Sequence, residues 1–535
     1  MLAGAVLLLC GVLVGSTSQV AAAPGIDLFG YGDWSTWQKD LLGSRHNAAE
    51  WRITEHNVGA LKEKWAFAYP KTPVPAKSQP AVVGRHIYFG SPDGKFYSLD
   101  ARTGKTEWTF TMKSVDPGAG YAVSLDGPTV VGDNVYFGDS RGYLYALHRH
   151  TGTLAWAKRI DALPASIVTS SPIYFDGRIY VGVSSVQNTA PDPKNPSKPD
   201  LKFPCCTFRG HIDAVNARTG DLEWRHYTVP KPKRAGNWPS GAKRYAPSGV
   251  GVWSTPTIDP ATRTLYVGTG QNYTGSAGEF DSILALDTGS GAVRWKRQMS
   301  NGDTWRAACA APGAKPGDCP GLNDGTALDY DMSSMPTIFT AGGRTLVGIG
   351  QKSGVFHVFD AHTGQIVWQR QLAEPNPNGG GTGVQWGGSY DGRRLYVATW
   401  FGDPGTVFAL DPGTGKILWK TPNPANGCTT GGAAQYPDAC VLAHTPAVSS
   451  SPGVVYEGST DGKMRAYSAR TGRVLWTYDT IRDYQGVNGL PGRGSQLSGG
   501  GGAVVSHGML YVQAGYGGYP SDKGPVLLAF SLNGT

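Results

Sequence analysis

The stretch LDARTGKTEW, residues 99–108, is one copy of a pattern that recurs along the whole chain. In each copy a short apolar segment leads into a tight turn closed by glycine, and a tryptophan follows. The glycine supplies the positive φ that such a turn needs. The tryptophan has a large apolar body and one N–H donor, so we expect it to pin one repeat to the next. Seven copies end at Trp108, Trp156, Trp224, Trp295, Trp368, Trp419 and Trp476.

An eighth copy is divided between the two ends of the chain. Residues 526–534, VLLAFSLNG, match the strand before the turn, and ALKEKWAF near the start places Trp65 at the repeat position. Self-similarity at this spacing indicates a propeller, and pairing the two ends leaves no sheet edge exposed. The sequence therefore predicts an all-β fold. We expect one eight-bladed β-propeller over residues 61–535, built of four-stranded antiparallel blades and closed by its N- and C-terminal strands.

The composition argues against nucleic-acid binding. Charged residues make up 16% of the chain, the net charge is +8, and no long run of like charge occurs. A solvated basic surface explains these values, and an acidic redox partner is the alternative.

The N-terminal segment is expected to direct export. Residues 1–23 are apolar and predict a signal peptide cleaved near Ala22, with an uncleaved anchor as the alternative. Residues 24–60 form a leader that we expect to pack against the outside of the ring. The protein is then secreted or periplasmic, with no membrane span after cleavage.

Six cysteines remain after Cys10, and they fall into three close pairs. An even number in an exported chain indicates disulfides. No CxxCH motif occurs, so we expect no covalent haem, and no CxxC pair is present for zinc. The pairs are Cys205/Cys206, Cys309/Cys319 and Cys428/Cys440.

The spacing of the repeats locates the long loops. Successive repeat tryptophans are furthest apart from Trp156 to Trp368, where each interval exceeds the roughly 40 to 45 residues of a bare blade. Long loops on a rigid scaffold often carry function, although decorative loops are the alternative. The first insertion holds the adjacent Cys205 and Cys206, either bonded to each other, free, or bonded elsewhere.

Several segments are more specific than the repeat. They include CCTFRG (205–210), PSGVGVWSTPTID (247–259), GQKSGVFHVFDAHTG (350–364) and DGKMRAYSARTGRVLWTYDT (461–480). Together they resemble the pyrroloquinoline-quinone (PQQ) dehydrogenases, the quinoprotein alcohol dehydrogenases, and within them the polyvinyl-alcohol dehydrogenase branch. That resemblance implies an eight-bladed propeller that binds PQQ.

The resemblance also implies a cofactor site. Trp253 would stack under the flat quinone, and the Cys205–Cys206 pair would cover its other face. Trp253 as an ordinary core residue is the alternative. The implied cofactor-binding residues are Cys205, Cys206, Trp253, Thr169, Ser184, Lys352, Gln385 and Trp386.

Thr169 and Ser184 match hydroxyl positions that bind the quinone carboxylates. Lys352 matches a cation beside the quinone oxygens, where positive charge stabilises the reduced form. Gln385 and Trp386 would line the same channel. Turn hydroxyls and a solvated lysine are the alternatives for the first three.

The implied catalytic residues are Asp329, Lys352 and Asp303. Asp329 best matches the family's general base, which takes the hydroxyl proton of the alcohol while hydride passes to the quinone C5. Asp303 is a second-choice carboxylate. An aspartate in a loop is otherwise usually a turn former.

The family binds Ca²⁺ beside the quinone as a Lewis acid. Here the ligand positions hold Gln187 in place of a glutamate and Gln271 in place of an asparagine. Amide oxygens can bind Ca²⁺, but the first change removes a negative charge, which leaves Asp329 and Asp331 as the anionic ligands. The expected metal set is Gln187, Gln271, Asp329 and Asp331.

These features predict an exported dehydrogenase that oxidises secondary alcohols, on polyvinyl alcohol or polyol-like substrates. Electrons would pass to a separate acceptor such as a cytochrome c. The altered metal positions favour the alternative, an inactive propeller of the same ancestry that acts as a binding or scaffold module.

Overall fold

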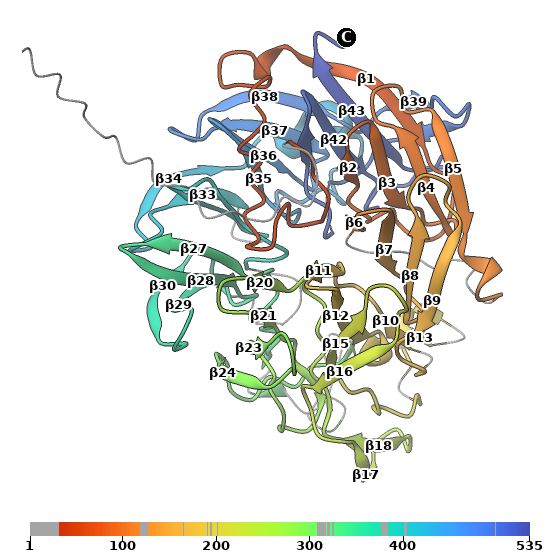
Figure 1. Cartoon of the computed structure of the whole chain (residues 1–535), viewed down its shortest axis with the longest axis vertical. Coiled ribbons are helices and arrows are strands. Elements are labelled where there is room, and N and C mark those ends of the chain that lie inside the picture. Colours follow the sequence, from red (N-terminus) through yellow and green to blue (C-terminus); the bar gives the residue numbers. More distant parts are fainter. Residues whose placement is uncertain are drawn as a thin grey trace, which may run out of the picture.

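A ring of small antiparallel sheets makes up the protein (Figure 1). The computed structural model describes residues 32–117, 127–163, 165–189, 191–192, 195–200, 202–307, 317, 322–323, 326–375, 383–400, 404–497 and 499–535. Its sheets form eight blades, which confirms the predicted all-β propeller. The predicted signal peptide lies outside the described residues.

Blades one to four follow one another along the chain. The strands of each are given in sequence order, and β10 (Ser166–Ile167) additionally pairs with β12 in blade three. They are β2 (Ala81–Val83), β3 (His86–Gly90), β4 (Lys95–Asp100) and β5 (Thr106–Thr111); β6 (Thr129–Val131), β7 (Asn134–Gly138), β8 (Tyr143–His148) and β9 (Leu154–Arg159); β11 (Ile173–Phe175), β12 (Arg178–Ser185), β15 (His211–Asn216) and β16 (Leu222–Tyr227); β20 (Thr257–Asp259), β21 (Thr264–Gly268), β23 (Ser282–Asp287) and β24 (Val293–Gln298).

Blades five to eight complete the ring, and the last joins the two ends of the chain. In blade eight, Leu61 of β1 pairs with Leu532 of β43, as predicted. The strands are β27 (Thr337–Ala341), β28 (Arg344–Gly350), β29 (Val355–Asp360) and β30 (Ile366–Gln371); β31 (Ser389–Tyr390), β32 (Leu395–Ala398), β33 (Thr406–Leu410) and β34 (Ile417–Pro422); β35 (Ser449–Ser451), β36 (Val454–Gly458), β37 (Lys463–Ser468) and β38 (Val474–Asp479); β41 (Val504–Ser506), β42 (Met509–Ala514), β43 (Val526–Leu532) and β1 (Leu61–Ala68).

Every repeat tryptophan holds its blade to the next one. The indole Nε1 donates a hydrogen bond to a backbone carbonyl of the following blade, and the eighth tryptophan, Trp65, does the same. The bonds are Trp65 to Ala101, Trp108 to Arg149, Trp156 to Ala217, Trp224 to Thr288, Trp295 to Ala361, Trp368 to Pro412, Trp419 to Ala469 and Trp476 to Leu61, at 2.8 to 3.1 Å.

The turn glycine of each repeat lies against the tryptophan of the preceding repeat. Gly364 has φ of +66°, and a Cβ at this position would lie 2.5 Å from the Trp295 ring. Gly415 has φ of +67° and the same relation to Trp368. The glycine is therefore required twice, for the turn itself and for the approach of the indole.

The strand order places the long loops at one end of the ring. Antiparallel strands alternate in direction, so connections from second to third strands and from one blade to the next emerge together. The three predicted insertions all occupy such connections, as expected for one face. They carry the hairpins β13 (Pro191–Asp192)–β14 (Asn195–Pro199), β17 (Lys233–Asn237)–β18 (Lys243–Ala246) and β25 (Leu322–Asn323)–β26 (Thr326–Ala327).

Other elements are short. Among the described residues no helix has the length and apolar character needed to cross a bilayer. Cys428 and Cys440 form the predicted disulfide, whereas Cys309 and Cys319 lie outside the described residues. The remaining elements are β19 (Ser248–Gly249) with β22 (Asn272–Thr274), β39 (Asp483–Gln485) with β40 (Pro491–Arg493), and the 3-10 turns η1 (Val58–Ala60), η2 (Met112–Ser114), η3 (Gln187–Thr189), η5 (Gly427–Thr429) and η6 (Gly431–Gln435).

The leader does not lie on the outside of the ring, as we expected, but along the first strands of the blades. Trp34 pairs with Val82 of β2, and further backbone bonds reach β6, β20, β27, β31 and β35 in ring order. The first strand of each blade has an unpaired inner edge, and the leader bonds to backbone groups of six of the eight first strands. Trp37 is buried in the same segment and donates to the Gly500 carbonyl.

The contact between glycine and tryptophan predicts the effect of Gly364→Ala. We expect a loss of about 1 to 2 kcal/mol from the positive φ and about 1 to 3 kcal/mol more from overpacking against Trp295. Thermal and denaturant unfolding, followed by tryptophan fluorescence, measures the change. Gly342→Ala is the matched control, since Gly342 has φ of +57° with open space around it. Equal losses in the two variants would contradict the packing role.

Candidate active site

Two aspartates and one lysine meet at the end of the ring that carries the long loops. Asp329 and Asp331 precede β27, and Lys352 lies between β28 and β29. The Lys352 Nζ donates to Asp329 Oδ1 at 2.8 Å and also pairs with the Asp331 carboxylate. The side chains of Lys352, Asp329 and Asp331 are 13%, 5% and 1% exposed. The structure therefore brings together the predicted base and the predicted cation.

Burial changes the ionisation of this cluster. It raises the pKa of Asp331 to about 6, with Lys352 opposing the shift and Asp329 adding to it. Burial would lower the pKa of Lys352, but the two carboxylates outweigh it and raise that pKa. Lys352 is thus a permanent positive charge between two acidic side chains.

Asp303 lies behind this cluster. Its Oδ2 accepts a hydrogen bond from the Tyr330 backbone N–H at 2.5 Å, so it holds the residue between Asp329 and Asp331. Asp281, which the sequence analysis missed, neighbours it. Burial, reinforced by nearby carboxylates, raises the pKa of both Asp281 and Asp303 well above the ordinary value. Both side chains are fully buried, which makes Asp303 a support for the cluster.

An aromatic floor lies beside the cluster. The Trp253 and Trp386 rings meet edge to face, with centroids 5.1 Å apart and planes at 73°. The Lys352 Nζ lies 5.5 Å from the Trp253 ring centroid, a cation–π distance. Trp386 packs on a buried cluster that includes Trp37 of the leader. Gln385, next to Trp386, is buried as well.

Gly270 allows the close approach of the floor and the cluster. A Cβ at Gly270 would lie 2.4 Å from Asp331 Oδ1 and 3.2 Å from Trp253 Nε1. Any side chain here would therefore separate Asp331 from Trp253.

Cys205 and Cys206 are bonded to each other and buried. The Cys205 carbonyl accepts hydrogen bonds from Trp238 Nε1 at 3.0 Å and from the Tyr245 N–H at 3.2 Å. Tyr273 packs in the same cluster, and its hydroxyl donates to the Ser185 carbonyl at 2.9 Å. Tyr273 thus links the disulfide to the strand that carries Ser184.

The predicted hydroxyl residues also meet. Thr169 Oγ1 and Ser184 Oγ are 3.1 Å apart and both are buried. The segments after Thr169 and Trp253 touch, because the Ser171 N–H donates to Thr255 Oγ1 at 3.1 Å. The buried hydroxyls of Ser171 and Ser254 have no hydrogen-bond partner among the described residues.

Unpaired buried hydroxyls are costly unless a ligand satisfies them. Those of Ser171 and Ser254 lie next in sequence to the Thr169 segment and to Trp253. Hydroxyls beside the half-buried Trp253 ring fit a flat, polar, acidic ligand such as PQQ. Sequence reasoning missed both serines because serine is common in such loops.

Of the predicted metal ligands, Asp329 and Asp331 meet at Lys352 and Gln271 contacts Asp331, whereas Gln187 is engaged with another segment. Gln187 Oε1 already accepts the Thr207 and Phe208 backbone N–H groups, at 2.7 and 2.9 Å, so this amide holds the segment after the disulfide. The Gln271 backbone N–H donates to Asp331 Oδ1 at 2.6 Å, and its side-chain nitrogen is oriented toward the same carboxylate.

Among the described residues, no group of three or more His, Cys, Asp or Glu is arranged to hold a metal ion. Lys352 lies between Asp329 and Asp331, and the Gln187 amide oxygen accepts hydrogen bonds from the Thr207 and Phe208 backbone. By themselves, the described side chains offer too few free oxygens for Ca²⁺, which takes six to eight oxygen ligands.

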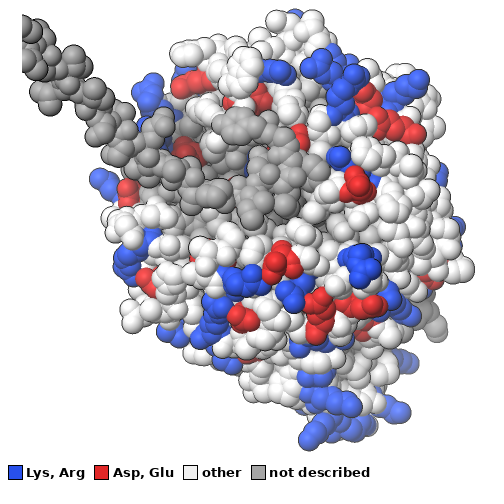
Figure 2. All heavy atoms as spheres, viewed as in Figure 1, with Lys and Arg blue, Asp and Glu red and all other residues white. Residues whose placement is uncertain are grey.

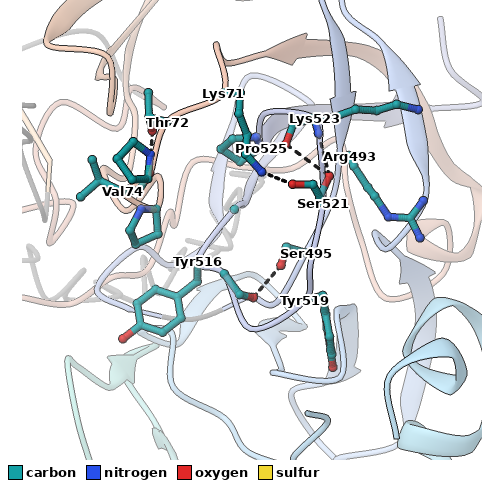
Figure 3. Close-up of a pocket in the computed structure, with 14 residues that line it drawn as sticks. Lys71, Thr72, Val74, Arg493, Ser495, Tyr516, Tyr519, Ser521, Lys523 and Pro525 are labelled. Atoms are coloured by element: carbon teal, nitrogen blue, oxygen red, sulfur yellow. Dashed lines mark hydrogen bonds between the residues drawn. The ribbon is translucent and has the colours of Figure 1, made fainter. Parts of the chain in front are cut away.

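A separate surface pocket of about 170 Å³ lies between blades eight and one at the same end of the ring (Figure 3). Two of its cations, Arg493 and Lys523, are paired with Asp483. Its lining residues include no Asp, Glu, His or Cys. It shares no lining residue with the Lys352 cluster.

The buried carboxylates predict a stabilising substitution. The raised pKa of Asp281 means that its charged form is penalised in the folded state at neutral pH, and that the penalty fades as the pH falls toward the unfolded value near 4. Asp281→Asn should therefore stabilise the protein at pH 7.5, with a gain that shrinks toward pH 4, in unfolding measured across that range. Asp287→Asn is the control. It should lower the free energy of unfolding, because Arg294 holds the pKa of Asp287 below its usual value. A gain for Asp281→Asn that does not depend on pH would contradict this assignment.

Two family models match the chain. Residues 34–314 match the PQQ family described as glucose/ethanol/alcohol dehydrogenase, beta-propeller domain, and residues 351–518 match the one described as outer membrane protein assembly factor BamB. Among solved structures, the quinohemoprotein alcohol dehydrogenase from Comamonas testosteroni superposes with a TM-score of 0.65 at 19% identity, covering 94% of this chain and 81% of that one. This likeness shows the fold alone.

Two curated relatives extend over nearly the whole chain. The polyvinylalcohol dehydrogenase of Sphingopyxis sp. (strain 113P3) is 30% identical, with 96% of this chain and 79% of that protein covered. The polyvinylalcohol dehydrogenase of a Pseudomonas sp. is 31% identical, with the same coverage. With one family model over more than half of its length and these relatives over nearly all of it, this chain belongs to the family of PQQ-dependent alcohol dehydrogenases.

Proposed function

We propose that this protein oxidises secondary alcohols, on polyvinyl alcohol or polyol-like substrates, and passes the electrons to an external cytochrome. The observation that carries the proposal is the buried group Asp329, Lys352 and Asp331 beside the Trp253 ring. When bound, PQQ supplies the hydride acceptor. The protein supplies the base, the positive charge and the binding surface.

Asp329 is the proposed general base. It removes the hydroxyl proton of the alcohol, which lets the carbon–hydrogen bond break. The Lys352 Nζ donates a 2.8 Å hydrogen bond to Asp329 Oδ1 and so fixes the position of the carboxylate. The same ammonium lies close to the Trp253 face, where it can balance negative charge that develops on a ligand seated there. Asp303 keeps the base in place through the Tyr330 N–H.

Trp253, Thr169 and Ser184 are the proposed cofactor-binding side chains, with the disulfide as the opposite cover. Trp253 offers a flat apolar face, and the two hydroxyls offer hydrogen bonds to carboxylates. Ser171 and Ser254 join this set, because their hydroxyls lack partners among the described residues. Gln385 and Trp386 extend the same wall, and the leader supports it from below.

The substrate class rests on the two relatives named polyvinylalcohol dehydrogenase. The position of the leader agrees with it. Because the leader occupies the first strands of the blades, a substrate would approach from the end with the long loops.

Export agrees with the two disulfides, which persist in oxidising compartments. We propose a secreted or periplasmic location and a separate cytochrome as acceptor. Calcium dependence remains a prediction from the family resemblance, and no step above uses it.

Reconstitution tests the proposal against the alternative of an inactive binding propeller. The purified protein is mixed with PQQ, without and with Ca²⁺, and dye-linked oxidation of polyvinyl alcohol and simple secondary alcohols is followed. Saturable PQQ binding with turnover supports the enzyme. PQQ binding without turnover on any of these alcohols favours the binding module. The Gln187 amide oxygen, which already accepts a backbone hydrogen bond from Thr207, would then explain the missing metal ligand.

The role of Asp329 predicts the behaviour of Asp329→Asn. The amide cannot accept a proton, so kcat/KM for the alcohol should fall by about 10²- to 10⁴-fold. PQQ binding, measured separately by absorbance titration, should be retained within a few fold. Asp287→Asn, at the end of β23 and outside the Lys352 cluster, serves as the control. Near-normal turnover by Asp329→Asn would assign the base to another residue.

The role of Trp253 predicts a loss of cofactor affinity. Trp253→Ala removes the stacking face, and stacking of a flat ring on an aromatic side chain is worth about 1 to 3 kcal/mol. The Kd for PQQ should therefore rise by about 5- to 150-fold, while Trp253→Phe should recover most of the affinity. Both values come from equilibrium titration. An unchanged Kd for PQQ in Trp253→Ala would show that Trp253 does not stack on the cofactor and is an ordinary core residue.

A further inference from the structure

The hairpin of β17 and β18 carries a concentrated positive charge. Between Glu223 and Asp259 the sequence holds six Lys and Arg residues and no Asp or Glu. Four of them, Lys231, Lys233, Arg234 and Lys243, are exposed. Figure 2 shows Lys and Arg gathered at the lower rim of the molecule, where Figure 1 labels β17 and β18.

This charge is not compensated within the part of the chain that the structure describes. None of Lys231, Lys233 and Lys243 forms an ion pair with a described carboxylate. Several exposed cations on other blades have partners. Lys158 pairs with Asp221 at 2.9 Å, and four further examples are Arg85 with Asp100, Arg294 with Asp287, Arg344 with Asp360 and Lys296 with Glu279.

The hairpin is firmly attached to the disulfide. Trp238, at its tip, is 3% exposed and donates through Nε1 to the Cys205 carbonyl at 3.0 Å. Tyr245 of β18 donates to the same carbonyl from its backbone N–H. The guanidinium groups of Arg306 and Arg244 lie 4.4 and 5.2 Å from the Trp238 ring centroid. The charged strands are therefore held in a defined place rather than on a free loop.

That place is beside the proposed cofactor site. The hairpin lies in the connection between blades three and four, at the end of the ring that also carries Trp253 and Lys352. A protein seated on it would contact the surface next to the Cys205–Cys206 pair. A fixed patch of uncompensated positive charge attracts partners of opposite charge and speeds their encounter.

We propose that the β17–β18 hairpin is the docking site of an acidic, electron-accepting protein. The assignment rests on the proposed function, because it names the partner of that same site. Each secondary alcohol oxidised to a ketone releases two electrons and two protons. Two ferricytochrome molecules in turn would each accept one electron, and the protons would pass to solvent.

The test uses the PQQ-loaded protein and a c-type cytochrome of acidic isoelectric point. The hairpin variant combines Lys231→Gln, Lys233→Gln and Lys243→Gln. The matched control combines Lys62→Gln, Lys105→Gln and Lys416→Gln, three exposed lysines that remove the same charge elsewhere. Lys105 and Lys416 lie in turns between third and fourth strands, at the opposite end of the ring. Unfolding temperature and PQQ titration confirm that both variants are intact.

At low ionic strength, kcat/KM for the acidic cytochrome should fall about tenfold in the hairpin variant and less than twofold in the control. The difference should disappear at about 1 M salt, where screening acts within roughly 3 Å. Turnover with a small neutral dye should be unchanged in both variants. A basic cytochrome should show no loss with the hairpin variant.

Equal losses in the two variants, or no loss in either, would overturn the docking site while leaving dye-linked turnover intact. Absence of dye-linked turnover in the wild-type protein would instead overturn the proposed function, and the docking site with it. A loss with the hairpin variant that persists unchanged at high salt would also overturn electrostatic docking.

Discussion

A single hydrogen bond, repeated around the ring, holds the structure together. In each blade an indole N–H reaches a carbonyl of the next blade, and the turn glycine leaves room for the ring. Since a buried N–H without a partner is costly, the eight bonds depend on the eight blades being in register. The bond from Trp476 to Leu61 closes the circle through the N-terminal strand. Each loop is therefore positioned by its neighbours as well as by its own blade.

The ring creates a second constraint, because the first strand of every blade presents an unpaired edge toward the axis. The leader forms backbone bonds to the first strands of six of the eight blades. Its buried Trp37 then supports Trp386, which meets Trp253 edge to face. The leader, which is distant in sequence from Trp253, thus helps to position the tryptophan pair on which a flat ligand would rest.

Charge is distributed unevenly above that floor. The aspartates at positions 281, 303, 329 and 331 are all buried, with Lys352 as the cation that contacts two of them. Buried carboxylates with little compensation destabilise a fold, and they concentrate where chemistry needs shifted pKa values. Outside this region, the surface of the β17–β18 hairpin has the opposite imbalance, and it is anchored to the disulfide. The two features give one end of the ring both an acidic interior and a basic exterior.

The sequence by itself determined the ring, its eight blades and the split last blade, because the repeat encodes a local turn and a contact with the immediate neighbour. It also identified Asp329, Lys352 and Trp253, whose motifs are distinctive. Only the tertiary structure decided where the leader runs, since its bonds join residues hundreds of positions apart. It likewise showed that the Gln187 amide oxygen binds the backbone after the disulfide, whereas Gln271 contacts Asp331. It also revealed Asp281, Ser171 and Ser254, whose roles depend on the absence of partners in three dimensions, which no local pattern records.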